Sequence, residues 1–109
     1  HSSEPQPDIA VVQRLGQDYR QHHPYPENIF WLMEYSDSSL AKDLEIKTQL
    51  YAAAAIPEYW VMNLQTRQLI VFRSPTTEGY QSQFRLSQGT IYPLAFPELA
   101  ISIERLLGA

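Results

Sequence analysis

The sequence predicts an α/β fold built on a mixed β-sheet. Two apolar segments, residues 8–12 and 29–35, have the length and composition of buried strands. A helical segment follows, and residues 58–63 and 69–73 then form a strand pair around a short turn. Because a helix crosses between two strands while a hairpin joins two others, we expect parallel and antiparallel neighbours in one sheet.

The main helix has a start signal and a stop signal. Residues 36–39 form a polar cluster of the kind that caps a helix N-terminus, and apolar residues at helical spacing continue to about Ala55. The dipeptide Ile56-Pro57 then ends the helix. The remaining segments are predicted from turn residues and weak alternation: loops at 16–28 and 74–79, an edge strand at 80–86, a proline-punctuated stretch at 89–97, a strand at 101–103 and a helix at 104–107.

The chain of 109 residues has the length of one domain, and we treat residues 1–109 as a single domain. One main helix and one short helix are too few to bury both faces of a sheet of this size. We therefore expect an upstream segment or a partner chain to supply a further layer, which implies that the N-terminal part of the domain is missing.

Charge and composition restrict the function. The net charge is −4, and the eight basic residues are spread from Arg14 to Arg105 without a basic run. Binding to nucleic acid needs cations on one face, so the fold, a second subunit or a metal ion must supply them. The sequence contains no cysteine, which excludes disulfides and cysteine-based zinc sites and is typical of a cytoplasmic protein. No apolar run reaches the roughly 18 residues that a membrane span requires.

Two carboxylates are candidates for a metal site. Asp8 opens the first apolar strand, and Glu34 stands near the end of the second. If these strands are neighbours, the two groups converge, and close carboxylates are stabilised by a hard cation such as Mg²⁺. The alternative is two separate solvated acids.

The helix carries a stripe of three polar side chains, Asp43, Lys47 and Tyr51, at intervals of four residues. One interpretation is an exposed ion pair between Asp43 and Lys47, worth about 0.2–0.5 kcal/mol. The other directs Lys47 back toward the carboxylates, where an ammonium group orients water or stabilises charge in a transition state.

An ordered set of motifs resembles a large bacterial family of restriction-endonuclease-like proteins in the PD-(D/E)xK nuclease superfamily. The resemblance covers nearly the whole chain, and its specificity lies in the order and spacing of the motifs. These are Pro7-Asp8, Glu34-Tyr35-Ser36-Asp37-Ser38-Ser39-Leu40, Asp43-x-x-x-Lys47-x-x-x-Tyr51, Ile56-Pro57-Glu58-Tyr59-Trp60-Val61 and Phe96-Pro97-Glu98-Leu99.

The resemblance implies a restriction-endonuclease-like fold and Mg²⁺-dependent hydrolysis of phosphodiester bonds. By position, Asp8 and Glu34 correspond to the two acidic metal ligands, the carbonyl of Tyr35 completes the metal shell, and Lys47 is the catalytic lysine. The chain departs from the common pattern at Ser36, where an E-x-K motif has its lysine, and at Tyr35, which is bulky and is expected to face the opposite side. Related chains also carry an N-terminal region that is absent before His1.

Other polar and aromatic residues have simpler interpretations. Adjacent His22 and His23 lack convergent partners, and the Tyr59-Trp60 pair is better explained by core packing than by base stacking. Two weaker hypotheses remain. An aromatic patch for a partner would be formed by Tyr80, Phe84 and Tyr92. Contacts to phosphate would be made by Arg14, Lys42, Arg67 and Arg73.

The leading hypothesis is a Mg²⁺-dependent endonuclease acting on DNA, with Mn²⁺ as a substitute and with Asp8, Glu34 and Lys47 as its catalytic residues. The alternative is a nuclease-fold module that has lost turnover and acts in protein interaction. A homodimer that completes the sheet is compatible with either.

Overall fold

A computed structural model of the chain describes residues 9–12, 29–36 and 41–108. Its main sheet has five strands in the order β1-β2-β3-β4-β5, with β1 and β5 at the edges. The strands are β1 (Ile9–Val12), β2 (Ile29–Ser36), β3 (Glu58–Asn63), β4 (Gln68–Thr76) and β5 (Gly79–Leu86). Beneath this sheet lies a smaller pair, β6 (Thr90–Ile91) and β7 (Ile101–Ser102), which leads into the short helix α2 (Ile103–Leu106).

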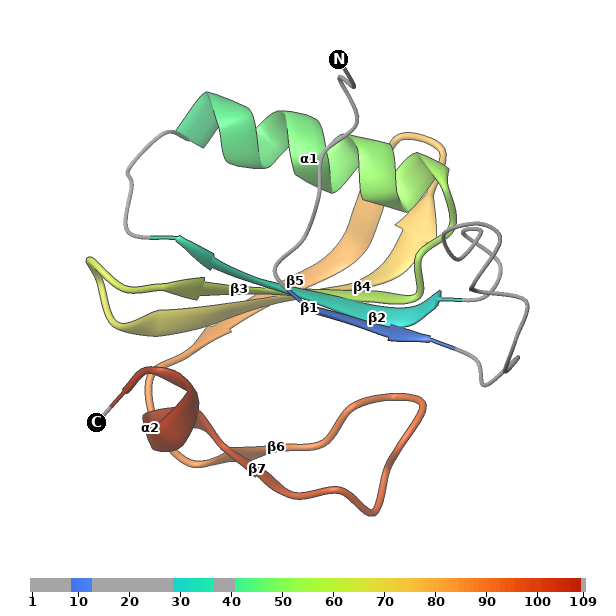
Figure 1. Cartoon of the computed structure of the whole chain (residues 1–109). Coiled ribbons are helices and arrows are strands. Elements are labelled where there is room, and N and C mark those ends of the chain that lie inside the picture. The colour runs from blue at the N-terminus through green and yellow to red at the C-terminus, as the bar shows by residue number, and fades with distance from the viewer. Residues whose placement is uncertain (1–8, 13–28, 37–40, 109) are drawn as a thin grey trace, which may run out of the picture.

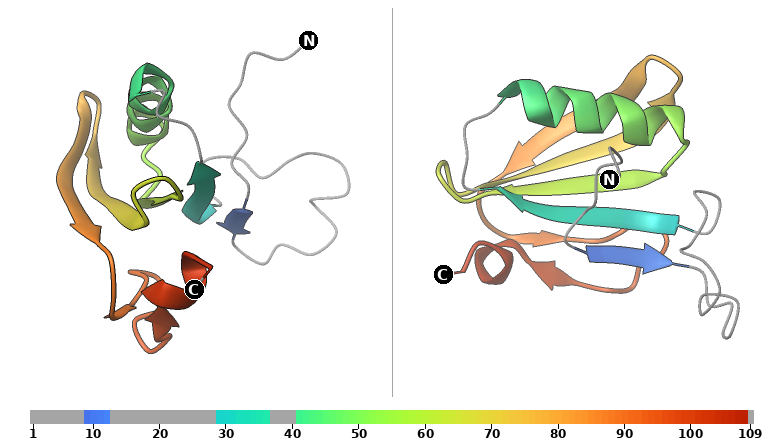
Figure 2. Two further views of the ribbon diagram at one scale, coloured as in Figure 1. Left: turned by 90° about the vertical axis from the view of Figure 1, so that its left-hand side faces the viewer. Right: turned by 45° about the horizontal axis from the view of Figure 1, so that its top comes forward.

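Helix α1 (Ala41–Ala53) crosses the sheet between β2 and β3, which pair in parallel. The other neighbouring strands of the main sheet pair antiparallel, so the prediction of a mixed sheet is confirmed. The figures show three layers, with α1 on one face of the sheet and the C-terminal segment on the other (Figures 1 and 2). Neither described helix has the length and apolar composition that crossing a bilayer needs.

Helix α1 ends through a backbone turn rather than through proline alone. Ala55 adopts a left-handed φ of 62°, which non-glycine residues rarely adopt. The N–H of Ile56 donates to the carbonyl of Tyr51 at 3.0 Å, and the N–H of Ala55 donates to Ala52 at 2.9 Å. This is the Schellman pattern, which satisfies two helix carbonyls and turns the chain into β3.

Alternation along the strands divides the core into two clusters. The face toward α1 buries apolar side chains from three strands and from the helix terminus: Leu32, Tyr51, Ile56, Tyr59, Val61, Ile70 and Phe72. The opposite face buries Trp31, Met33, Trp60, Met62, Leu69 and Val71 against Ile91, Ile103 and Leu107. The cover that we expected from an upstream segment or a partner chain therefore comes, on this face, from the downstream segment around β6, β7 and α2.

The buried carboxylate of Glu58 attaches the C-terminal segment to the sheet. Its side chain is fully buried, and it accepts hydrogen bonds from Trp60 Nε1 at 2.7 Å, Arg73 Nε at 2.7 Å and the N–H of Leu94 at 2.8 Å. Arg73 also donates to the carbonyl of Tyr92 at 2.8 Å. Glu58 and Arg73 thus have structural roles on the face away from α1.

The β4–β5 hairpin is longer than expected. Residues 74–76, predicted to lie in a loop because of Pro75, belong to β4, where Pro75 pairs with Tyr80. The strand tolerates Pro75 close to its end, directly after Ser74, whose φ is 61°. The prediction that residues 80–86 form an edge strand is confirmed, since β5 is the outer strand of the sheet.

Candidate functional site

Glu34 lies two residues before the end of β2, on the face covered by α1. Leu32 belongs to the core cluster on that face, and strand alternation gives Glu34 the same direction. The residue is 8% exposed. A carboxylate buried to this extent needs hydrogen-bond or ionic partners, because desolvation disfavours its charged form.

Lys47 supplies the first partner of Glu34. Its Nζ lies 2.7 Å from Glu34 Oε1, although 13 positions separate the two residues in the chain. The parallel crossover explains the contact, since α1 runs back over the strand that precedes it. The structure therefore brings together two of the three residues proposed from the sequence as catalytic, in the arrangement that directs Lys47 toward the carboxylate.

Asp43 is a second, more exposed partner of Lys47. Its Oδ2 lies 3.5 Å from Lys47 Nζ, and its side chain is 61% exposed. The hydrogen bond to Glu34 raises the pKa of Lys47 above its usual value, while burial acts in the opposite direction and the charges of Glu34 and Asp43 add smaller upward contributions. Lys47 is consequently an ammonium ion at neutral pH.

Tyr59 supplies the second partner of Glu34, a role that the sequence did not indicate. Its hydroxyl donates to Glu34 Oε2 at 2.8 Å, and its ring is fully buried. Tyr59 pairs with Leu32 in the parallel ladder, which places it on the face of Glu34, two residues away. Burial, followed by the proximity of Glu34, raises the pKa of Tyr59, so its hydroxyl remains a donor. The signals available in the sequence were the hydroxyl of a tyrosine next to apolar residues and its place in the motif of residues 56–61.

Tyr51 completes the described surroundings of Glu34. Its ring meets that of Tyr59 edge to face, with 4.9 Å between centroids. Its hydroxyl oxygen is buried and has no hydrogen-bond partner among the described residues. Burial raises the pKa of Tyr51 to about 12, and the negative charges of Glu34 and Asp43 contribute to this shift. The third residue of the predicted helix stripe therefore also faces the site.

The described residues include donor atoms of the type that a hard cation prefers. Glu34 and Asp43 offer carboxylate oxygens, which Mg²⁺ and Mn²⁺ prefer. Within residues 9–12, 29–36 and 41–108, no three acidic, histidine or cysteine side chains gather as a metal-binding group. Asp8, the other proposed acidic ligand, lies outside the described residues. Its chain neighbour Ile9 pairs with Met33, the residue before Glu34.

The remaining candidates from the sequence fall into three groups. Tyr35 is 40% exposed, and strand alternation directs its side chain away from the face of Glu34. Tyr59 and Trp60 are buried in the core, as the packing interpretation predicted. His22, His23 and Arg14 lie outside the described residues.

The aromatic and basic candidates do not form the surfaces considered from the sequence. Tyr80 packs against the cluster under α1 and Phe84 against the opposite one, so these two rings do not share one patch. Arg73 pairs with Glu58 and is not available at the Glu34 end of the sheet. Arg67 is exposed in the turn after β3, whose last residue, Asn63, pairs with Ser36 at that end. The side chain of Lys42 lies outside the described part of the chain.

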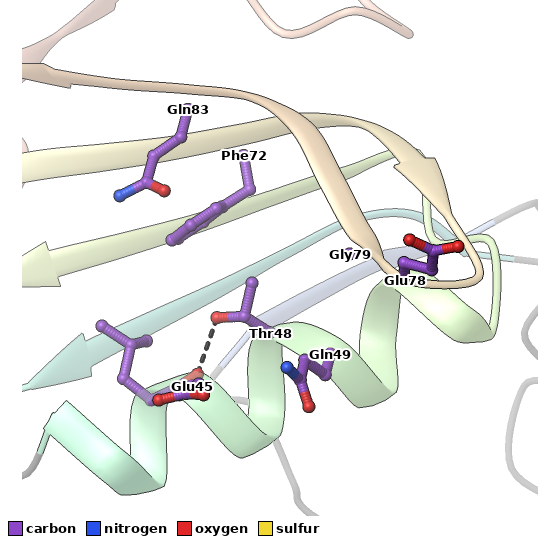
Figure 3. A pocket seen from close by; sticks show the side chains of 8 residues that line it. Glu45, Thr48, Gln49, Phe72, Glu78, Gly79 and Gln83 are labelled. Carbon is purple, nitrogen blue, oxygen red and sulfur yellow. Dashed lines mark hydrogen bonds between the residues drawn. The ribbon is translucent and has the colours of Figure 1, made fainter.

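A groove between α1 and the β4–β5 hairpin lies apart from Glu34. It is lined by Leu44, Glu45, Thr48, Gln49, Phe72, Glu78, Gly79 and Gln83 (Figure 3). The Thr48 hydroxyl is used within α1, since it donates to the carbonyl of Leu44 at 2.6 Å. Two carboxylates line the groove, so its charge does not suit a phosphate backbone.

Comparison with known families identifies the chain at the level of its family. The family model Uma2, described as "Putative restriction endonuclease", matches residues 1–104. The chain belongs to the Uma2 family. The mixed sheet with its crossing helix agrees with the restriction-endonuclease-like fold of this family, and the expected resemblance is confirmed. A search of curated proteins found no match.

Membership in the Uma2 family gives the contact between Glu34 and Lys47 a chemical context. Restriction-endonuclease-like proteins are nucleases that generally use divalent metal ions. Among the described residues, the buried carboxylate of Glu34 in contact with the Lys47 ammonium is the candidate for such a centre.

Proposed function

We propose that this Uma2-family chain is a metal-dependent endonuclease that hydrolyses phosphodiester bonds of DNA, with Mg²⁺ as cofactor and Mn²⁺ as a substitute. The observation that carries the proposal is the 2.7 Å contact between Lys47 Nζ and the buried carboxylate of Glu34. In this proposal Asp8, Glu34 and the carbonyl of Tyr35 hold the metal ion, and Asp8, Glu34 and Lys47 are the catalytic residues. When bound, the metal ion would supply Lewis-acid chemistry and an activated water.

The protein groups have separate tasks in this scheme. Before the metal ion binds, Lys47 and Tyr59 hold the carboxyl group of Glu34 in position through one hydrogen bond to each of its oxygens. The Lys47 ammonium is charged at neutral pH and can offset the negative charge that develops on a phosphate in the transition state. The low exposure of Glu34 strengthens these interactions, because a dry site screens charge less than water does.

The role proposed for Asp8 is supported by the pairing of its neighbour in the chain. Ile9 pairs with Met33 in the antiparallel ladder of β1 and β2, and Met33 directly precedes Glu34. This pairing supports a shared role for Asp8 and Glu34, since each is the chain neighbour of one of the two paired residues. An Asp8→Asn substitution in the full chain is expected to weaken Mn²⁺ binding about tenfold or more, since it removes one charged ligand.

A row of residues that pair across neighbouring strands, starting at Glu34, supports DNA as the substrate. Successive pairings join Glu34 to Val61, Val61 to Ile70 and Ile70 to Arg85. Arg85 is exposed on the edge strand, and Arg67 is exposed in the turn at the same end of the sheet. Two of the scattered cations therefore lie on this row or at its end of the sheet, which supports contact with a phosphate backbone in spite of the net charge of −4.

The test is a panel of substrates incubated with the full chain and Mg²⁺, Mn²⁺ or a chelator. Supercoiled plasmid, linear duplex DNA and duplex RNA are compared for wild type and for Glu34→Gln. We expect cleavage of DNA that requires the metal and is lost in Glu34→Gln, while the exposed Glu98→Gln serves as a matched control with full activity. Metal binding without cleavage of any substrate would instead favour the inactive interaction module.

The homodimer remains part of the proposal. Strands β1 and β5 are the edges of the main sheet and are the places where a second copy would extend it. Sedimentation equilibrium of the full chain would give twice the monomer mass if the dimer forms, and the monomer mass would exclude it.

A further inference from the structure

The two carboxylate oxygens of Glu34 have partners of different mobility. Tyr59 donates to Oε2 from a fully buried ring that lies between Tyr51 and Phe72, with centroid distances of 4.9 and 5.6 Å. Lys47 contacts Oε1 from the end of a flexible four-carbon chain, and its side chain is 21% exposed. The bond to Oε2 is therefore fixed by packing, whereas the bond to Oε1 can open without disturbing the core.

Lys47 also has an alternative acceptor within reach. Asp43 lies one turn earlier on α1, with its Oδ2 at 3.5 Å from Lys47 Nζ and its side chain largely in solvent. If the ammonium left Glu34, it would keep an ionic partner on its own helix. A small rotation of the Lys47 side chain is enough for this exchange, and α1 need not move.

We propose that a divalent cation binds Glu34 through Oε1 by displacing the Lys47 ammonium, which transfers to Asp43, while Tyr59 stays on Oε2 and keeps the carboxylate in position. The ammonium and the cation cannot contact Oε1 together, because like charges about 4 Å apart repel strongly in a partly buried site. This inference rests on the proposed nuclease function, since the cation is the one that the nuclease requires. It adds that Lys47 competes with the cation and that Tyr59 is a positioning residue.

The test measures the affinity of the full chain for Mn²⁺ by calorimetry, without DNA. Lys47→Met removes the competing ammonium, so the affinity is expected to rise about tenfold, the equivalent of one charge-assisted hydrogen bond. Tyr59→Phe removes the bond that orients Glu34, so the affinity is expected to fall about tenfold. Tyr80→Phe is the matched control, because it removes a partly buried hydroxyl, bonded to the carbonyl of Ile56, and should leave the affinity unchanged.

The variant Asp43→Asn distinguishes two possible roles of Asp43. Asp43 either accepts the displaced Lys47 ammonium or binds the cation directly. In the wild-type background this change removes the alternative acceptor, and Mn²⁺ affinity is expected to fall severalfold. In the Lys47→Met background it should have no effect, since no ammonium is left to transfer. An equal loss in both backgrounds would show that Asp43 is itself a ligand and would overturn the exchange.

The opposite signs expected for Lys47→Met and Tyr59→Phe exclude a merely structural effect, which would weaken binding in both. If a variant is too unstable for calorimetry, the rise in its melting temperature on adding Mn²⁺, relative to its own metal-free value, gives the same comparison. Unchanged or weaker Mn²⁺ binding by Lys47→Met, or no binding by wild type, overturns the inference. Tighter binding by Lys47→Met in a chain that cleaves no DNA would refute the nuclease and support the exchange.

Discussion

Replacing Glu58 by glutamine should weaken the attachment of the C-terminal segment to the sheet. The carboxylate accepts three hydrogen bonds in a fully buried position, two at Oε2 from Trp60 and Arg73 and one at Oε1 from Leu94. A glutamine has the same shape but offers an acceptor on one side only. If its oxygen faces Trp60 and Arg73, its amide group meets the N–H of Leu94, and two donors oppose each other.

The expected loss follows from these contacts. A hydrogen bond that involves a charged group is worth about 1.5–3 kcal/mol, and a buried donor left without a partner costs about 1–3 kcal/mol. The ionic contribution of Arg73 is discounted, because its side chain is 21% exposed. We therefore expect Glu58→Gln to lower the free energy of unfolding by about 2–3 kcal/mol, a large part of the 5–15 kcal/mol typical of a domain.

Urea unfolding followed by tryptophan fluorescence measures this change, since Trp31 and Trp60 are both buried in the cluster next to Glu58. The midpoint should fall by about 1 M or more, given slopes of about 1–3 kcal/mol per molar urea. Glu98→Gln is the control, because Glu98 is exposed in the same segment and should change stability by less than about 0.5 kcal/mol. Equal midpoints for the two variants would refute the structural role assigned to Glu58.

Three further predictions concern stability. Tyr51→Phe should raise the free energy of unfolding by about 1 kcal/mol in urea titrations, because it removes a buried hydroxyl without a described partner, whereas Tyr80→Phe should lower it by about the same amount. Stability should fall as the pH rises above 10, because folding raises the pKa of Tyr51 from 10.0 to about 12 and also raises the pKa of Lys47, Tyr59 and Tyr80, so unfolding releases protons. In denaturation followed at pH 9–12, Tyr51→Phe should remove the part of this decline that comes from Tyr51. Ala55→Gly should raise the melting temperature, because glycine adopts a φ of 62° without the strain of about 1 kcal/mol that alanine carries there. An unchanged melting temperature would contradict the assigned helix terminus.

Much of the main sheet could be predicted because its strands and helix have strong local patterns. Residues 59–62 are apolar side chains between a helix stop and a turn, and β3 has the predicted bounds, Glu58–Asn63. The C-terminal layer was harder to predict. Its buried anchors are Ile91, Ile103 and Leu107; prolines and polar residues separate the first two, and the last two span only one helical turn. Which face they cover depends on tertiary packing alone.

The candidate site was partly predictable for a related reason. The crossover from β2 to α1 made contact between Glu34 and Lys47 a reasonable expectation, and the two side chains meet at 2.7 Å. The hydroxyl of Tyr59 was not predicted, because its position beside Glu34 depends on the parallel register of β2 and β3, which local sequence does not specify. Nor does sequence distinguish two buried glutamates with different tasks, Glu34 beside a lysine of α1 and Glu58 beneath the C-terminal segment.

The central claim is that the contact between Glu34 and Lys47 belongs to a hydrolytic centre. Its most direct test is the rate of plasmid cleavage by Lys47→Met at Mn²⁺ concentrations that saturate both this variant and wild type. Metal occupancy is then equal, so a loss of rate reports on the ammonium group itself. We expect a fall of about 100-fold or more, as when a group that stabilises transition-state charge is removed. Metal-dependent cleavage by wild type and Lys47→Met at the same rate would contradict the account.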